Sequence, residues 1–307
     1  MSTETDVFLA EMVPKQRAAD GAIHDGDAGP RLALWSQHDP LTLFGASLSG
    51  SGRAELEPMF HNVASWFSHS DSFDLEIIAA GASADLAYTV GYEHTTTTVD
   101  GTPRKYNLRV THVYRREDGT WRIVHRHADF PAEEASVPLP SGRTGPMLGE
   151  RQAMGTETEA FLSEILPKQR DMTVALHKGD VTARIALWSH TDPTTLFGAH
   201  ISGVGWTDLE PKFRQEATRF AGATGFEFEV VAAGTSGSLA YTVGLEHSHA
   251  VVDGVPADYT MRTTHVYRRE DGAWRIVHRH SDLFQFNIPG DPSAAPCGGA
   301  RCSRERC

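Results

Sequence analysis

The sequence has no cysteine before residue 297, and its three thiols, Cys297, Cys302 and Cys307, all fall at the end of the chain. A disulfide framework therefore does not hold the rest of the chain together. The spacing of the thiols matches no common zinc motif, and three thiolates would leave a tetrahedral site open. We expect neither a metal nor another cofactor, and we predict that residues 286–307 form a disordered tail.

Long apolar runs and an excess of basic charge are also absent. No stretch approaches the roughly 20 apolar residues of a membrane span, and the acidic start Met1–Asp6 is unlike a signal peptide. Lys and Arg number 28 against 40 Asp and Glu, a net charge of -12. Nucleic acids and anionic lipids are bound by basic surfaces. The composition predicts a cytoplasmic protein that binds neither nucleic acid nor membranes.

The chain contains a long internal duplication. Residues 3–129 align without a gap on residues 156–282, and more than half of the pairs are identical. Thr111–Gly119, for example, recurs unchanged as Thr264–Gly272. Each copy is long enough to bury a core of its own. We predict two domains, 1–131 and 156–285, joined by a linker at 132–155 that is rich in Pro and Gly.

Each copy changes from a helical to a strand pattern. In the first copy, helices are expected at about 7–25, 31–36 and 54–69, and strands at about 73–80, 86–95, 106–116 and 121–128. Asp100-Gly101 and Asp118-Gly119 are typical of hairpin turns. The pattern predicts an α+β fold in which N-terminal helices pack on a curved antiparallel sheet.

Strand register decides which polar side chains share a face of that sheet. A short loop at 100–102 would pair Glu93 with Arg109, as a cross-strand ion pair or as a clamp for a ligand. At Asp118-Gly119 two registers are open. A two-residue turn pairs His112 with His125. A three-residue loop with a bulge places His112 on the opposite face from His125.

Three segments of the first copy, 22–27, 34–36 and above all Arg115–His127, resemble the nuclear transport factor 2-like superfamily. Within it the chain is most similar to SnoaL-like domains and to the association domain of calcium/calmodulin-dependent kinase II. The resemblance implies a cone-shaped domain in which a curved sheet and helices enclose a pocket. Members of the superfamily include ketosteroid isomerases, polyketide cyclases and proteins without catalytic activity, so the fold alone does not give the function.

The isomerase residues of that superfamily are missing from this chain. Phe44 or Leu43 occupies the place of the base carboxylate, and about Ala19 the place of the first-helix tyrosine. The oxyanion-stabilising acid matches about His112, with His265 in the second copy. The resemblance thus implies that His112 and His265 are the candidate catalytic residues, because an imidazole serves as an acid or base near neutral pH.

The candidate ligand-binding residues are the polar sheet residues and one tryptophan in each copy. They are Trp35, Glu93, Arg109, His125 and His127, with their counterparts Trp188, Glu246, Arg262, His278 and His280. The alternative is structural: core packing for the tryptophans, and hydrogen bonding at a sheet edge or domain interface for the histidines. Arg31 and Arg184 are expected to be solvated, and His24 and His177 to be helix caps or surface residues.

Together these features predict an intramolecular pseudo-dimer with a mostly apolar pocket for a small organic ligand in each domain. Further oligomerisation is compatible with the sequence. Two functions fit it. One is a metal-free and cofactor-free isomerase, cyclase or hydrolase that works by acid–base chemistry. The other is a non-catalytic ligand-binding or assembly module.

Overall fold

The computed structural model describes residues 3–131 and 155–287. The predictions for the linker and for the tail from residue 288 fall on residues outside these ranges. The first copy consists of α1 (Thr3–His24), α2 (Gly29–Leu34), β1 (Thr42–Phe44), β2 (Ser49–Ser51), α3 (Arg53–Ser65), β3 (Phe67–Ser83), β4 (Leu86–Val99), β5 (Thr102–Glu117) and β6 (Thr120–Asp129). The second repeats this order as α4 (Thr156–Leu176), α5 (Thr182–Leu187), β7 (Thr195–Phe197), β8 (Ser202–Val204), α6 (Trp206–Ala217), β9 (Phe220–Ser236), β10 (Leu239–Val252), β11 (Val255–Glu270) and β12 (Ala273–Asn287).

The α+β architecture predicted from the sequence is confirmed in both copies. Each copy forms a six-stranded sheet, in the order β2-β1-β6-β5-β4-β3 and β8-β7-β12-β11-β10-β9. The short strands β1 and β7, which the sequence pattern did not reveal, add to the sheet edges in parallel to β6 and β12. The last strand runs to Asn287, so two residues assigned to the tail belong to the sheet.

The helices cover one face of each sheet because their apolar residues lie on one side. In α3 the buried residues are Leu56, Phe60 and Ala64, spaced four apart along the helix. The sheet in turn bends around the helices. At Gly91 of β4 a Cβ atom would lie 1.8 Å from the carbonyl oxygen of Glu76, so only glycine allows the two strands to approach there.

Two-residue turns join β4 to β5 and β5 to β6, and the Asp and Gly of each turn have positive φ, as in a type I′ hairpin. The first turn pairs Val99 with Thr102 and therefore Glu93 with Leu108, not with Arg109 as expected. After the second turn, a bulge at Val124 shifts the register by one residue.

The bulge changes which histidines share a face. His112 pairs with Arg126 on the concave face, toward the helices, and His125 pairs with Val113 on the opposite face. The turn is thus the two-residue type, but the expected His112–His125 pair does not form. The faces are those expected for a three-residue loop, because one extra residue in a strand reverses every side chain beyond it.

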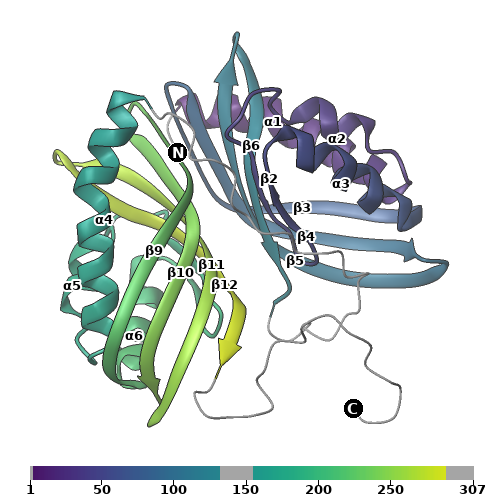
Figure 1. Cartoon of the computed structure of the whole chain (residues 1–307). Helices are drawn as coiled ribbons and strands as arrows, with labels where there is room; N and C mark the ends of the chain where they lie inside the picture. The colour runs from purple at the N-terminus through teal and green to yellow at the C-terminus, as the bar shows by residue number, and fades with distance from the viewer. Residues whose placement is uncertain (1–2, 132–154, 288–307) are drawn as a thin grey trace, which may run out of the picture.

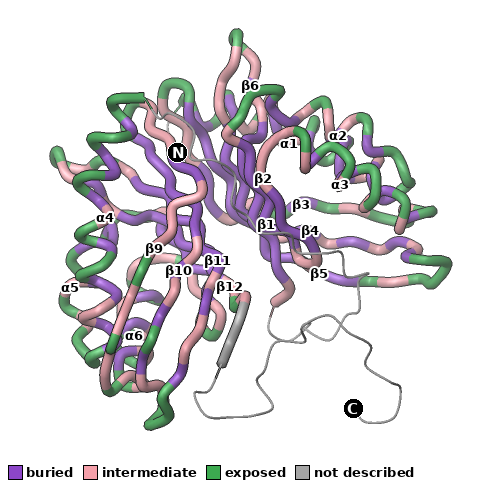
Figure 2. The backbone as a smooth tube through the Cα atoms, viewed as in Figure 1, coloured by how far each residue is buried: buried purple, intermediate pink, exposed green. Residues whose placement is uncertain are grey.

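The two domains pack sheet against sheet, with their helices on the outside (Figure 1). The contacts are reciprocal. Arg109 donates to the carbonyl of Gly198 and Arg262 to that of Gly45, at 2.8 and 2.7 Å. Equivalent residues meeting in both directions define an approximate two-fold axis. Buried residues follow the strands where the sheets face each other (Figure 2). Within the described ranges, no helix combines the length and apolarity needed to cross a bilayer.

Candidate functional site

The convex faces of the sheets form the domain interface, and Arg109 lies there rather than beside Glu93. Its Nε donates to Asp129 at 2.8 Å, and its Nη1 reaches Ser202 of the other domain, also at 2.8 Å. Arg262 makes the equivalent pair with Asp282. The ion pairs expected between Glu93 and Arg109 and between Glu246 and Arg262 are therefore wrong, because the hairpin register puts the partners on opposite faces.

The four histidines of the last strands also lie between the domains. The Nδ1 atom of His125 forms a hydrogen bond with the hydroxyl of Thr42 at 2.6 Å, and its Nε2 atom forms one with the hydroxyl of Thr264 of the other domain at 2.7 Å. His278 makes the same pair of contacts with Thr195 and Thr111. None of the four lines a cavity within a domain. Of the two roles that the sequence left open for them, the geometry is that of interface hydrogen bonding.

At the centre of the interface two imidazoles stack on each other. The rings of His127 and His280 are 3.8 Å apart and nearly parallel. Each contacts a carboxylate of the other domain, His127 with Asp282 at 2.8 Å and His280 with Asp129 at 2.9 Å. Burial, followed by the neighbouring His280, lowers the pKa of His127 well below 6.5. Burial also lowers the pKa of His280, although its contact with Asp129 opposes this shift.

His112 and His265 lie on the concave faces of their sheets, where α1 and α4 cover them. The amide of Gln16 in α1 contacts the imidazole of His112 at 3.1 Å, and Gln169 contacts His265 at 3.0 Å. Burial lowers the pKa of both histidines well below 6.5, and the nearby arginines add to the effect. Neither histidine is among the residues lining the cavities described next.

A cavity opens at the equivalent place in each domain, between the helices and the concave face of the sheet. Its volume is about 70 Å³ in the first domain and about 90 Å³ in the second. The walls are mostly apolar, and, beside an equivalent tyrosine (Tyr106 or Tyr259), the same four ionisable residues line both. They are His24, Arg31, Glu93 and Arg126 in the first domain and His177, Arg184, Glu246 and Arg279 in the second.

In the first domain these charges are all paired. Arg126 donates to Glu93 at 2.6 Å, and Arg31 donates to Asp20 of α1 through Nε at 3.0 Å and through Nη2. Burial alone would lower the pKa of Arg31, but Asp20 and Glu93 raise it instead. Two buried arginines therefore face two buried carboxylates. His24 completes the wall, and burial and Arg31 lower its pKa to about 4.

The second domain keeps the pair at the sheet but loses the one at the helix. Arg279 donates to Glu246 at 2.6 Å. The counterpart of Asp20 is Thr173, and among the described residues no carboxylate lies within ion-pair distance of Arg184, whose Nε has no hydrogen-bond partner. Burial, followed by Arg279, lowers the pKa of Arg184 to about 10.

The sequence interpretation missed most of this cluster. Arg31 and Arg184, expected in solvent, are only 8% and 6% exposed, and His24 and His177 are also buried. The available signal was the spacing Gln16, Asp20, His24, a polar stripe four residues apart along one face of α1. Glu93 and Glu246 line the cavities, and their role in ligand binding stays a prediction.

The two tryptophans are core residues, which was one of the two roles considered for them. Trp35 is 1% exposed and packs on Phe60 at 5.0 Å between ring centroids. Trp188 packs on Phe213 at 4.8 Å in the second domain. Neither lines a cavity.

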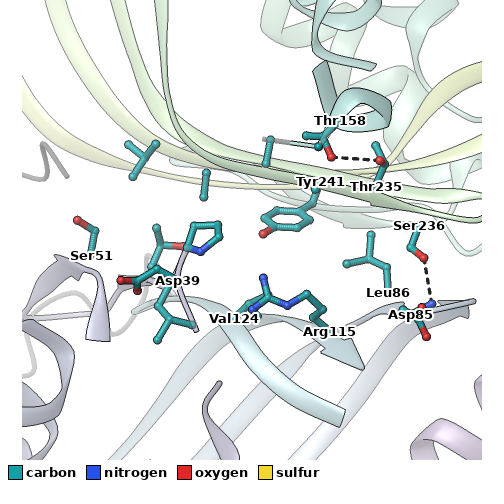
Figure 3. A pocket seen from close by; sticks show the side chains of 18 of the residues that line it. Asp39, Ser51, Asp85, Leu86, Arg115, Val124, Thr158, Thr235, Ser236 and Tyr241 are labelled. Carbon is teal, nitrogen blue, oxygen red and sulfur yellow. Dashed lines mark hydrogen bonds between the residues drawn. The ribbon is translucent and has the colours of Figure 1, made fainter. Parts of the chain in front are cut away.

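A third and larger space, of about 670 Å³, lies between the domains (Figure 3). Arg115 and Tyr241 point into it from the two sheets. The guanidinium of Arg115 is already paired with Glu117 and with the carbonyl oxygen of His38. This space therefore offers a ligand no unpaired buried charge among the described residues that line it.

Comparisons with known proteins agree with the duplicated architecture. The model of the SnoaL-like domain matches residues 18–133 and again residues 169–283. Among solved structures, a nuclear transport factor 2-like protein of unknown function from Pseudomonas putida is 24% identical, with a TM-score of 0.35, and the match covers 42% of this chain and 89% of that one. A superfamily protein from Salmonella enterica is 21% identical, with a TM-score of 0.37 and coverage of 43% and 97%.

A proposed calcium/calmodulin-dependent protein kinase type II association domain from Thiobacillus denitrificans is also similar. It is 20% identical, with a TM-score of 0.32, and the match covers 40% of this chain and 92% of that one. No curated protein sequence matches the chain.

Proposed function

The chain belongs to the SnoaL-like domain family, and from this premise we propose that it is a small-molecule-binding protein whose ligand sites are the two intradomain cavities. The observation that carries the proposal is that both domains place buried charges on the wall of an otherwise apolar cavity. Few convergent polar groups in an apolar pocket are typical of sites that orient a small ligand.

Burying these charges is costly, which argues for a role beyond folding. A buried ion pair is often no more stabilising than apolar residues of the same size. Yet Arg126 and Glu93 recur as Arg279 and Glu246, although more than a third of the aligned positions differ between the copies. Both volumes are below the roughly 300 Å³ at which pockets begin to hold drug-sized ligands. We expect a ligand of a few carbon atoms, or one whose remainder extends through the mouth.

The positions of His112 and His265 favour ligand binding without catalysis. The imidazoles of His112 and His265 contact Gln16 and Gln169 and are not cavity-lining, and their lowered pKa values keep them neutral at pH 7. Acid–base catalysis by His112 and His265 stays a prediction, tested with the variants given in the Discussion.

The test is a ligand-detected NMR screen of a library of small neutral and charged fragments. Ala46 and Ala199 line the two cavities at equivalent positions, and Phe at either position would fill the mouth. Hits should lose binding to one domain in Ala46→Phe or Ala199→Phe. They should keep it in the control Ala54→Phe, on the exposed side of α3. Hits that persist in the double variant Ala46→Phe/Ala199→Phe would place the sites elsewhere.

A further inference from the structure

The cavities of the two domains carry different net charges. Arg31, Arg126 and Glu93 line the first cavity, and Asp20 pairs with Arg31, so that these charges sum to zero. The second contains Arg184, Arg279 and Glu246, which leave one positive charge. Glu216 and Arg219 also line the second cavity, where the first has Val63 and Trp66, but their opposite charges cancel. The difference in net charge therefore arises where the first domain has Asp20 and the second has Thr173.

Arg184 is the group that the substitution leaves without a partner. It is 6% exposed, lines the cavity, and stacks over the ring of Phe213 at 5.4 Å from the centroid. A buried guanidinium without a carboxylate is expensive, and a planar carboxylate is the anion that best fits its geometry. Thr173 also lines the cavity, so the place that the Asp20 carboxylate takes in the first domain is open to a ligand in the second.

The other charges near the mouth do not neutralise Arg184. Glu216 lies 3.5 Å from Arg219, and Arg219 also pairs with the exposed Asp253 at 2.8 Å. Glu216 raises the pKa of Arg184, but by less than burial and Arg279 lower it. Of these groups only Glu216 and Arg219 line the cavity, and their charges cancel, whereas the side chain of Asp253 is 59% exposed and is screened by solvent.

Building on the proposed function, we propose that the second domain binds a small organic monocarboxylate whose carboxylate pairs with Arg184, and that the first domain does not, because Asp20 already occupies the equivalent position. A single negative charge balances the cavity, whereas a phosphate dianion would leave an excess of negative charge. Ser281, which replaces Ala128 of the first domain, adds a hydroxyl beside Arg279 in the same wall. Leu176, Leu196 and Ile201 provide the apolar surface for the rest of the ligand.

The test exchanges the two residues in the full-length chain. Butyrate and benzoate are the charged probes, and butyramide and benzamide are their neutral counterparts, all titrated by isothermal calorimetry. The wild type should bind one carboxylate per chain and bind the amides at least about tenfold more weakly, since one missing charged hydrogen bond accounts for that factor. Thr173→Asp should abolish carboxylate binding and raise the melting temperature, because the new carboxylate pairs with Arg184.

The reverse exchange keeps the proposal falsifiable if Thr173→Asp fails to fold. Asp20→Thr should create a second carboxylate site, so that the stoichiometry rises from one to two. Thr207→Asp, an exposed position at the start of α6, adds the same charge away from the cavity and should leave binding unchanged. Amides that bind as tightly as carboxylates would overturn the carboxylate assignment and leave the proposed function standing. Failure of both probe classes and of the fragment screen would overturn both.

Discussion

Acidification from pH 7 to pH 5 should destabilise this protein strongly, because the folded state buries neutral histidines. The pKa is lowered from 6.5 to about 4 for His24 and His177 and to about 3 for His125. In the unfolded chain each imidazole takes up a proton near pH 6.5. Between that pH and the folded pKa the unfolded state binds more protons, so the unfolding free energy falls as the pH falls.

The magnitude follows from the same values. Each of these three histidines should remove about 2 kcal/mol between pH 7 and pH 5, and the three together roughly 6 kcal/mol. Total stabilities of domains are about 5–15 kcal/mol. His112, His127 and His278 shift in the same direction, and Glu93, whose pKa burial raises, opposes them. We therefore expect unfolding on mild acidification.

The assay is urea denaturation at pH 7, 6 and 5. His125→Gln should flatten the dependence of the unfolding free energy on pH by about 1 kcal/mol per pH unit, since one proton uptake is removed. His61→Gln, at an exposed position of α3, is the matched control and should leave the slope unchanged. A denaturation midpoint that stays constant or rises toward pH 5 would refute the burial of neutral imidazoles.

Two further predictions concern single groups. His112→Asn should lower the unfolding free energy by about 1–3 kcal/mol, because the contact with Gln16 is lost. It should leave ligand affinity within about twofold. If an activity is found, a drop of about 10²-fold in turnover with stability intact would instead support acid–base catalysis. Asp129→Asn and Asp282→Asn should each cost about 3–5 kcal/mol in thermal or urea unfolding, because a buried arginine loses its carboxylate. Clearly unequal costs would contradict the two-fold interface.

Repetition, fold class and turn chemistry could be predicted from the sequence because each depends on local pattern. The gapless repeat shows two equivalent domains, and the apolar spacing of Leu56, Phe60 and Ala64 predicts a helix with one buried face. Asp118-Gly119 predicts a hairpin turn, although not its length, because Asp and Gly adopt positive φ more readily than most residues.

Which histidine side chains share a face of the sheet depends on one feature that the local sequence pattern does not encode. The bulge at Val124 separates His112 from His125, which then lies on the face that forms the interface. A bulge is set by how the sheet must bend around its helices and against its partner, so the tertiary structure decides it. The predicted pairing of Glu93 with Arg109 was wrong for a different reason: the turn at Asp100-Gly101 has two residues, so Glu93 pairs with Leu108.

The sequence by itself determined that the chain contains two copies of one α+β fold. Only the tertiary structure showed which polar residues meet. The sequence predicted that Arg31 is solvated. It is buried because α2 packs against α1, and its guanidinium pairs there with Asp20. A charged side chain is predicted from the sequence to be exposed unless its partner is known. The partner of Arg31 lies on a different helix, so the local sequence does not reveal it. Arg184 is buried in the same way, but it lacks this partner because Thr173 takes the place of Asp20.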